Sequence, residues 1–107
     1  MYAKKLLKRL KPDDVEERVG FVLNTGRVVE LKNVCPEPKE GFEVSAADLQ
    51  KYSDKVVASW HTHPGANANL TVEDARSFRD FPEWEHYIIG TDGVKRYLVK
   101  DGAVIVG

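Results

Sequence analysis

The sequence predicts an α+β fold in a single domain spanning residues 1–107, with a mostly antiparallel, curved sheet and about three helices packed on it. Two observations predict this class. Short runs rich in β-branched and aromatic residues are separated by glycine-containing turns, as in antiparallel hairpins. Two other stretches begin with a hydroxyl residue followed three positions later by aspartate, which is a helix start signal.

The first helix is expected from Tyr2 to Lys11. Leu6, Leu7 and Leu10 fall on one helical stripe, and Pro12 ends the helix because proline cannot continue it. Most other positions of this stretch are basic. We interpret the basic face as solvated rather than as a membrane anchor, because the apolar stripe is short.

A hairpin is expected next, with strands at Val19–Asn24 and Arg27–Lys32 around a turn that contains Gly26. A proline-punctuated loop with Cys35 follows, and Phe42-Glu43-Val44 is a candidate short strand. The chain has one cysteine, which cannot form an internal disulfide and fits a reducing compartment.

The second helix is expected to open at Ser45, in the pattern Ser45-x-x-Asp48, and to continue to about Tyr52. Val56–Trp60 then forms a buried strand. The third helix begins near Thr71, with an inner side formed by Ala75, Phe78 and Val72.

Three strands close the chain, and the Asp-Gly pairs that link them favour two-residue hairpin turns. They are expected at His86–Thr91, Val94–Lys100 and Ala103–Val106. We assign His86 a surface or cross-strand role rather than metal binding. Trp60 and Trp84 are expected to be core or half-buried anchors.

The overall charge is nearly balanced, with 16 Lys and Arg against 17 Asp and Glu. Such a balance gives no reason to expect a nucleic-acid or membrane partner. The sequence has no long apolar run and no signal-peptide pattern. We therefore expect a cytoplasmic protein that is not secreted by a signal peptide.

Candidate metal ligands cluster where the Val56–Trp60 strand ends. Residues two apart on a strand point to the same face, so His61 and His63 project together. Asp74 would lie in the first turn of the helix that begins near Thr71. Two imidazoles and a carboxylate from a strand end and a helix start can form an open three-ligand site for Zn²⁺, with water in the fourth position.

An alternative explanation applies to part of this pattern. Thr71-x-x-Asp74 also fits a capping box, with Thr71 as the N-cap. Capping does not account for His61 and His63, two of the three histidines in the chain, which lie shortly before it. We therefore favour metal binding, and the capping role can hold at the same time.

The motif His61-x-His63-Pro64, followed after a short loop by Thr71-x-x-Asp74, resembles the JAMM (MPN+ or JAB) metallopeptidase motif. In that family the sequence is His-x-His-Pro and then Ser-x-x-Asp, so threonine stands here where serine is usual. The resemblance implies a JAB/MPN-like, cytidine-deaminase-like architecture.

The family also needs an upstream glutamate, usually in Glu-x-x-Gly before the first strand. Glu17-Arg18-Val19-Gly20 is similar to that pattern. Glu16 is the rival if the register is shifted by one residue.

Within the family, the chain most resembles the N-terminal domain of phage lambda-type tail assembly proteins. In those proteins a papain-like cell-wall peptidase domain usually follows. The segments that carry the likeness are Glu17-x-x-Gly20-Phe21-Val22, Phe42-x-Val44-Ser45, His61-x-His63-Pro64-Gly65, Leu70-Thr71-x-x-Asp74 and Pro82-x-Trp84.

The resemblance implies a role for each site residue. His61, His63 and Asp74 would hold Zn²⁺, which lowers the pKa of water from 15.7 towards about 7. Glu17 would accept the proton of that water and pass it to the leaving amine. The Thr71 hydroxyl would help to stabilise the oxyanion.

The expected reaction is hydrolysis of a peptide or isopeptide bond. The chain is too short for the large insertions that clasp ubiquitin, which favours a minimal bacterial or phage-type enzyme. A phage tail protein and peptidoglycan are the expected substrates, in the host cytoplasm or the phage tail. Two alternatives stay open: a metal-stabilised structural or binding module of a phage tail tip, and a bacterial deconjugase of a ubiquitin-like modifier.

Overall fold

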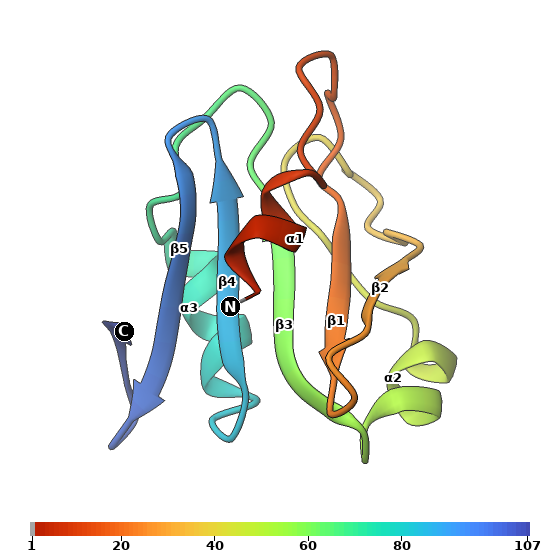
Figure 1. Ribbon diagram of the computed structural model, residues 1–107, viewed down its shortest axis with the longest axis vertical. Coiled ribbons are helices and arrows are strands. Elements are labelled where there is room, and N and C mark those ends of the chain that lie inside the picture. Colours follow the sequence, from red (N-terminus) through yellow and green to blue (C-terminus); the bar gives the residue numbers. More distant parts are fainter. Residues whose placement is uncertain (1) are drawn as a thin grey trace.

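The computed structural model describes residues 2–107, which form a six-stranded mixed sheet and three helices (Figure 1). The expected α+β class is thus confirmed. The strands are β1 (Val19–Leu23), β2 (Val28–Leu31), β3 (Val56–Thr62), β4 (Glu85–Gly90), β5 (Gly93–Lys100) and β6 (Ala103–Val106). The helices are α1 (Ala3–Leu7), α2 (Ala46–Tyr52) and α3 (Val72–Arg79).

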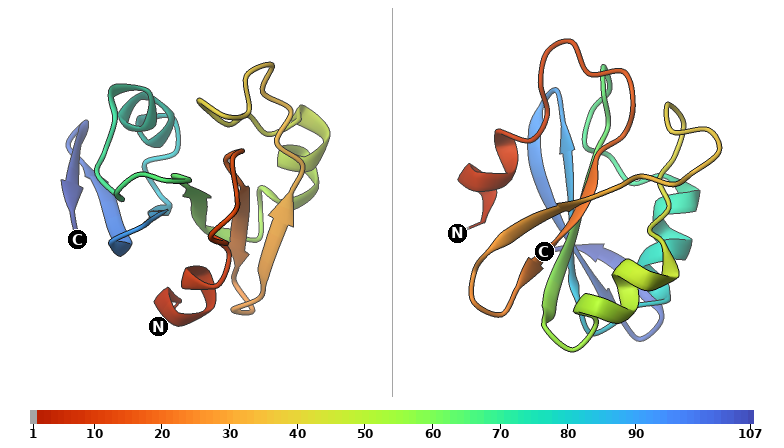
Figure 2. Two further views of the ribbon diagram at one scale, coloured as in Figure 1. Left: turned by 90° about the horizontal axis from the view of Figure 1, so that it is seen from above. Right: turned by 90° about the vertical axis from the view of Figure 1, so that its right-hand side faces the viewer.

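The strands follow the order β2-β1-β3-β4-β5-β6 across the sheet. Every pairing is antiparallel except that of β3 with β4, which is parallel because α3 crosses over between these two strands. Figure 2 shows α1 on one face of the sheet and both α2 and α3 on the other. None of the helices in residues 2–107 is long and apolar enough to cross a membrane.

Coverage on both faces explains why β1 is a continuous apolar run rather than an alternating one. Val22 packs with Leu6 of α1 and with Trp60 on one face. Phe21 and Leu23 pack on the other face, where side chains of α2 cover them. β1 is therefore packed on both faces next to the point where the candidate site begins.

Gly20 has a packing role between strands. A Cβ at this position would overlap the carbonyl oxygen of Val29 and lie 2.5 Å from the Trp60 ring. The indole of Trp60 is fully buried against this glycine. The glycine of the Glu17-x-x-Gly20 pattern thus lets the β3 tryptophan pack closely against β1.

The structure corrects two expected elements. α1 ends at Leu7 rather than Lys11. Leu6 and Leu10 pack against the same core cluster, but Leu7 is 52% exposed, so the three leucines do not form one buried stripe. The Phe42-Glu43-Val44 segment is irregular rather than a strand. The Asn33 side chain accepts the backbone N–H of Glu43, which is a group that a strand ladder would use.

Two expected side-chain placements are also wrong. Val72 does not lie on the inner side of α3 but is 67% exposed. His86 is not at the surface; it is buried and stacks on the Phe78 ring with the ring centroids 4.2 Å apart. The cross-strand alternative for His86 is confirmed, because its Nδ1 lies 2.6 Å from Oγ of Ser59 on the adjacent strand β3.

Candidate metal centre

Three segments meet at one end of the sheet. His61 lies near the end of β3, His63 directly after it, and Asp74 in the first turn of α3. The segment before β1 is tied to the same place by two hydrogen bonds: Thr62 N–H donates to the Arg18 carbonyl at 2.9 Å, and Arg18 N–H donates to Thr62 Oγ1 at 2.8 Å.

The side chains expected to bind zinc lie close together. His61 Nε2 is 3.2 Å from His63 Nε2 and 3.0 Å from Asp74 Oδ1. His63 Nε2 is 3.1 Å from Asp74 Oδ2. Ligand atoms of tetrahedral zinc lie about 2.0–2.1 Å from the ion, which sets two of them roughly 3.3 Å apart. The spacing of this cluster is compatible with one tetrahedral ion.

The orientation of His63 is set by the loop that follows it. His63 Nδ1–H donates to the Asn67 carbonyl at 2.8 Å, which turns Nε2 toward Asp74 and His61. Metal-binding histidines commonly have their second nitrogen fixed in this way. The sequence reasoning did not identify Asn67, because its contribution is a backbone carbonyl that any residue could supply.

The loop itself is fixed against β4 and β5. A Cβ at Gly90 would overlap the backbone of Asn67 and Ala68, so the loop lies directly on that glycine. Ala68 N–H donates to Asp92 Oδ1, and the Tyr97 hydroxyl donates to the Ala68 carbonyl, both at 2.8 Å. The carbonyl that orients His63 is therefore held by two strands.

Asp74 takes part in both the ligand cluster and the helix cap. Thr71 Oγ1 accepts the Asp74 N–H at 3.1 Å, and Asp74 Oδ2 accepts the Thr71 N–H at 3.3 Å. The capping box is thus present together with the histidine contacts. Burial alone would raise the pKa of Asp74, but hydrogen bonds from His61 and His63 outweigh burial and lower it.

The electrostatics of the cluster favour a cation. Burial lowers the pKa of His61, which keeps that imidazole neutral. Burial acts in the same direction on His63, but its hydrogen bonds with Asp74 and the Asn67 carbonyl outweigh it and raise the pKa. Two imidazole nitrogens and a carboxylate that converge in a buried place can hold a positive ion once Nε2 of His63 has lost its proton. The exposed fractions are 1% for His61, 9% for His63 and 5% for Asp74.

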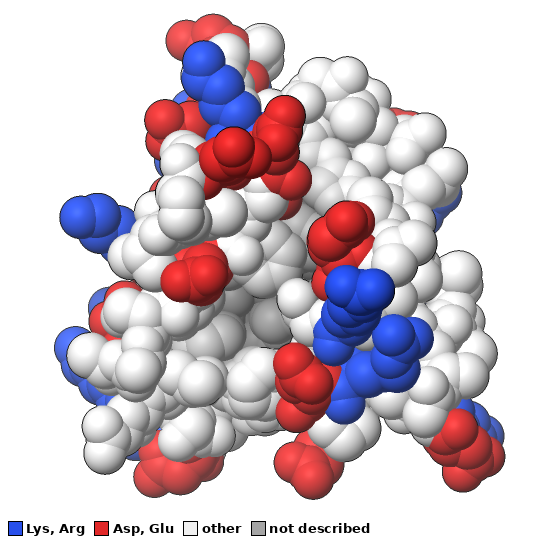
Figure 3. All heavy atoms as spheres, turned by 180° about the vertical axis from the view of Figure 1, so that it is seen from behind, with Lys and Arg blue, Asp and Glu red and all other residues white. Residues whose placement is uncertain are grey.

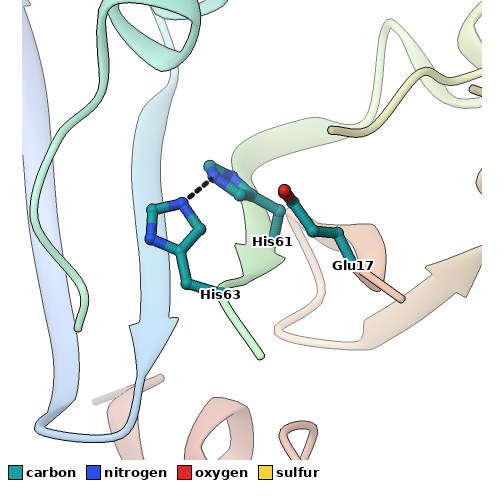
Figure 4. Close-up of side chains that lie close together, drawn as sticks. All are labelled: Glu17, His61 and His63. Carbon is teal, nitrogen blue, oxygen red and sulfur yellow. Dashed lines mark hydrogen bonds between the residues drawn. The ribbon is translucent and has the colours of Figure 1, made fainter. Parts of the chain in front are cut away.

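Glu17 approaches the same cluster from the segment before β1. Its carboxylate and the two imidazoles each offer one atom within 4.8 Å of the others, and Figure 4 shows Glu17 directed toward His61. In the described chain, Glu17 forms no ion pair with either histidine, whereas Asp74 pairs with both. Burial raises the pKa of Glu17 to about 7. Its rival Glu16 is exposed and lies outside this cluster.

Asn33 is a positioning residue that the sequence reasoning missed. Its Nδ2 donates to the carbonyls of Glu17 and Gly41, at 2.9 and 3.0 Å. Its Oδ1 accepts the N–H groups of Cys35 and Glu43, both at 3.0 Å. The contact with Cys35 two residues later is an Asx turn, the one local signal available in the sequence. The other partners are distant in sequence.

A cleft of about 280 Å³ opens beside the cluster. Thr71 lines it together with four carboxylate residues, and none of its lining residues in the described chain is Lys or Arg. The carboxylates belong to Glu17, Glu40, Glu73 and Asp74. The cleft is thus an acidic space next to the converging histidines, with room for a small extended ligand.

No protein-family model matches the chain, and no curated protein matches it. Among solved structures, the chain is similar to the solution structure of protein DSY2949 from Desulfitobacterium hafniense, with a TM-score of 0.73 and 21% sequence identity. The match covers 97% of this chain and 84% of that one. At this identity the similarity supports the fold alone.

Proposed function

We propose that the chain is a JAMM-type zinc metallopeptidase or isopeptidase with a JAB/MPN-like, cytidine-deaminase-like fold. The observation that carries the proposal is the convergence of His61, His63 and Asp74 to within 3.0–3.2 Å beside an acidic cleft. The directed approach of the Glu17 carboxylate supports it further. A purely structural cluster would not require this fourth group.

In this proposal His61, His63 and Asp74 hold Zn²⁺. The bound ion would supply a Lewis acid and make hydroxide available near neutral pH. Glu17 accepts the proton of the attacking water and returns it to the leaving amine. Thr71 Oγ1 accepts from the Asp74 N–H, so its hydroxyl hydrogen is free to donate to the substrate carbonyl oxygen.

Substitution of Glu17 tests the catalytic part of the proposal. Glu17→Gln should retain one zinc per chain and lose hydrolysis by about 10²–10⁴-fold, the usual contribution of general acid–base catalysis. Glu16→Gln is the matched control, because it removes a neighbouring exposed carboxylate and should leave the rate unchanged. Full activity in Glu17→Gln would rule out Glu17 as the base.

The substrate class is the second part of the proposal. We expect a peptide or isopeptide bond in a phage tail protein or in peptidoglycan, acted on in the host cytoplasm or the phage tail. Assays on muropeptides, on tail protein and on di-glycine isopeptide conjugates would separate these substrates from a deconjugase acting on a ubiquitin-like modifier. Activity on the conjugates alone would identify the deconjugase.

A second candidate function is a metal-stabilised module of a phage tail tip that binds partners without catalysis. The burial of all three candidate ligands favours it, because a metal ion held by buried ligands can stabilise a fold. This candidate predicts that Glu17→Gln leaves tail assembly intact. The hydrolase predicts instead that the same variant accumulates uncleaved substrate.

A further inference from the structure

A second cavity, of about 290 Å³, lies next to the candidate metal cleft and has no role in the hydrolysis proposed above. Its walls come from β1, β3, β4, α2 and α3, and from the irregular segment between β2 and α2. Seen from the side of α2 and α3, the molecular surface is hollowed between two lobes, with charged groups around the hollow (Figure 3).

The cavity walls are aromatic and packed against each other. Trp84 stacks on Phe81 with ring centroids 4.3 Å apart and contacts Phe21 edge to face at 5.4 Å. Phe78 stacks on His86 at 4.2 Å. These mutual contacts hold the rings without a ligand, so the cavity is formed in advance.

The cavity adjoins the metal cleft. Phe42 and Ser77 line both spaces. The Phe42 ring also stacks on the His61 imidazole, with centroids 4.3 Å apart. One aromatic ring therefore separates a candidate zinc ligand from the apolar cavity. Consecutive Cα atoms are about 3.8 Å apart, so a peptide with its amide in the cleft can place the adjacent side chain in the cavity.

We propose that this cavity is the specificity pocket for a bulky apolar side chain, aromatic or large aliphatic, next to the scissile amide. The inference rests on the proposed hydrolase function. Pockets for drug-sized ligands hold about 300–1,000 Å³, so a cavity of 290 Å³ suits one side chain rather than a larger group. Glu43 and Asp80, both exposed, also line the cavity, which disfavours an acidic side chain.

Amino-acid hydroxamates test this pocket, because the hydroxamate group binds zinc while the side chain is varied. The probes are the N-acetylated α-hydroxamates of glycine, phenylalanine and glutamate, titrated calorimetrically into the zinc-loaded chain. The phenylalanine probe should bind at least about tenfold more tightly than the glycine probe, a gain of about 1.4 kcal/mol. The glutamate probe should bind no more tightly than the glycine probe.

Variants at Val44 test whether the preference for phenylalanine arises in the apolar cavity. Val44 lines the apolar cavity and not the metal cleft, so Val44→Phe should fill the cavity and reduce the preference for phenylalanine to below about threefold. Val72→Phe is the matched control, because it adds the same ring at an exposed position of α3 and should keep the full preference. If Val44→Phe does not fold, Val44→Ala should shift the preference toward the larger naphthylalanine hydroxamate.

The outcomes separate this inference from the proposed function. If the chain binds zinc tightly and binds the glycine probe, but binds the phenylalanine probe no more tightly, the specificity pocket is contradicted while the metal centre is supported. A preference that survives in Val44→Phe and does not shift in Val44→Ala would also overturn it. A chain that binds neither zinc nor any hydroxamate would overturn both.

Discussion

The side chain of Asn33 joins the two segments that flank the candidate site. It makes four hydrogen bonds, to the backbone of Glu17, Cys35, Gly41 and Glu43. These bonds fix the backbone that carries the proposed base, and they also hold the irregular segment containing Phe42. No other described side chain binds both segments in this way.

Replacement of Asn33 by alanine should therefore affect stability and rate but not metal content. We expect a loss of about 1–3 kcal/mol in the free energy of unfolding, because half-buried backbone groups lose their partners. The hydrolysis rate should fall about tenfold or more, while zinc stays near one per chain. Urea unfolding, elemental analysis and the substrate assay check these values.

Asn24→Ala provides the comparison for Asn33→Ala. Asn24 is exposed at the β1–β2 turn, so its replacement should change stability by less than about 0.5 kcal/mol. Loss of zinc in Asn33→Ala would contradict a role limited to positioning Glu17.

His86 makes the stability of the chain depend on pH. Burial lowers its pKa in the folded state, and the hydrogen bond to the Phe81 carbonyl only partly opposes this. The nearby His61 imidazole, which lies across the Phe78 ring, lowers the pKa of His86 further. As the pH falls below about 6.5, His86 becomes protonated in the unfolded chain but stays neutral in the folded chain. The free energy of unfolding therefore decreases.

His86→Gln should remove this titration. The variant will be less stable at pH 7.5, because the imidazole bonds both Ser59 and the Phe81 carbonyl. Its stability should decline less steeply than that of the wild type between pH 6.5 and 5.5, by up to about 1.4 kcal/mol per pH unit. Urea unfolding at several pH values tests this, and parallel curves for the two proteins would contradict it.

At the scale of the element, α2 and α3 begin with similar caps but different consequences. Ser45 accepts the Asp48 N–H at 3.1 Å, as Thr71 accepts the Asp74 N–H. Only the second cap holds a candidate ligand, because Asp74 also contacts both histidines. A comparison of variants at the two caps can thus separate the effect of helix capping on stability from its effect on metal binding.

Thr71→Ala and Ser45→Ala should each cost about 1 kcal/mol of unfolding free energy, the usual value of an N-cap. Thr71→Ala should also weaken zinc binding by about 10–100-fold, because the backbone N–H of the Asp74 ligand loses the hydroxyl that accepts it at the start of α3. Ser45→Ala should leave zinc affinity unchanged, and Thr71→Ser should behave as the wild type. Competition with a zinc chelator measures the affinities; equal affinity in the two alanine variants would contradict the link between cap and site.

Local patterns predicted the elements that carry the site, and distant contacts account for the misses. His61 and His63 are two apart near a strand end and Thr71-x-x-Asp74 opens a helix, so periodicity and capping suffice to place them. The buried position of His86 depends on Ser59, 27 residues away, and on the Phe81 carbonyl. Such partners leave no local signal.

The segment at Phe42 illustrates the same limit. Its alternating residues favour a strand, but the Asn33 side chain binds the backbone N–H of Glu43 and replaces a ladder hydrogen bond. The segment therefore stays irregular and holds its phenylalanine over His61. Sequence patterns alone cannot show that a side-chain hydrogen bond will form in place of a strand pairing.

At the scale of the whole molecule, a bound metal would join three parts of the fold. The candidate ligands come from β3, the residue after it, and α3, and Glu17 approaches from the segment before β1. Free zinc at 100 times the dissociation constant should stabilise the folded chain by about 2.7 kcal/mol. For a domain of this size, the melting temperature should then rise by roughly 10–20 °C.

Chelation should reverse this rise in the wild type. His63→Ala should show no zinc-dependent shift at all, since it removes one candidate ligand, whereas Glu17→Gln should keep the full shift. Thermal unfolding followed by circular dichroism, with and without chelator, gives the comparison. A shift of equal size in His63→Ala would mean that the stabilising ion binds elsewhere.

The most direct test of the metal centre is the zinc content of the purified chain, measured by elemental analysis for the wild type and four variants. We expect one zinc per chain in the wild type and in Glu17→Gln, and none in His61→Ala, His63→Ala and Asp74→Ala. A zinc-free wild type under zinc-replete conditions, or full zinc content in Asp74→Ala, would contradict the three-ligand centre.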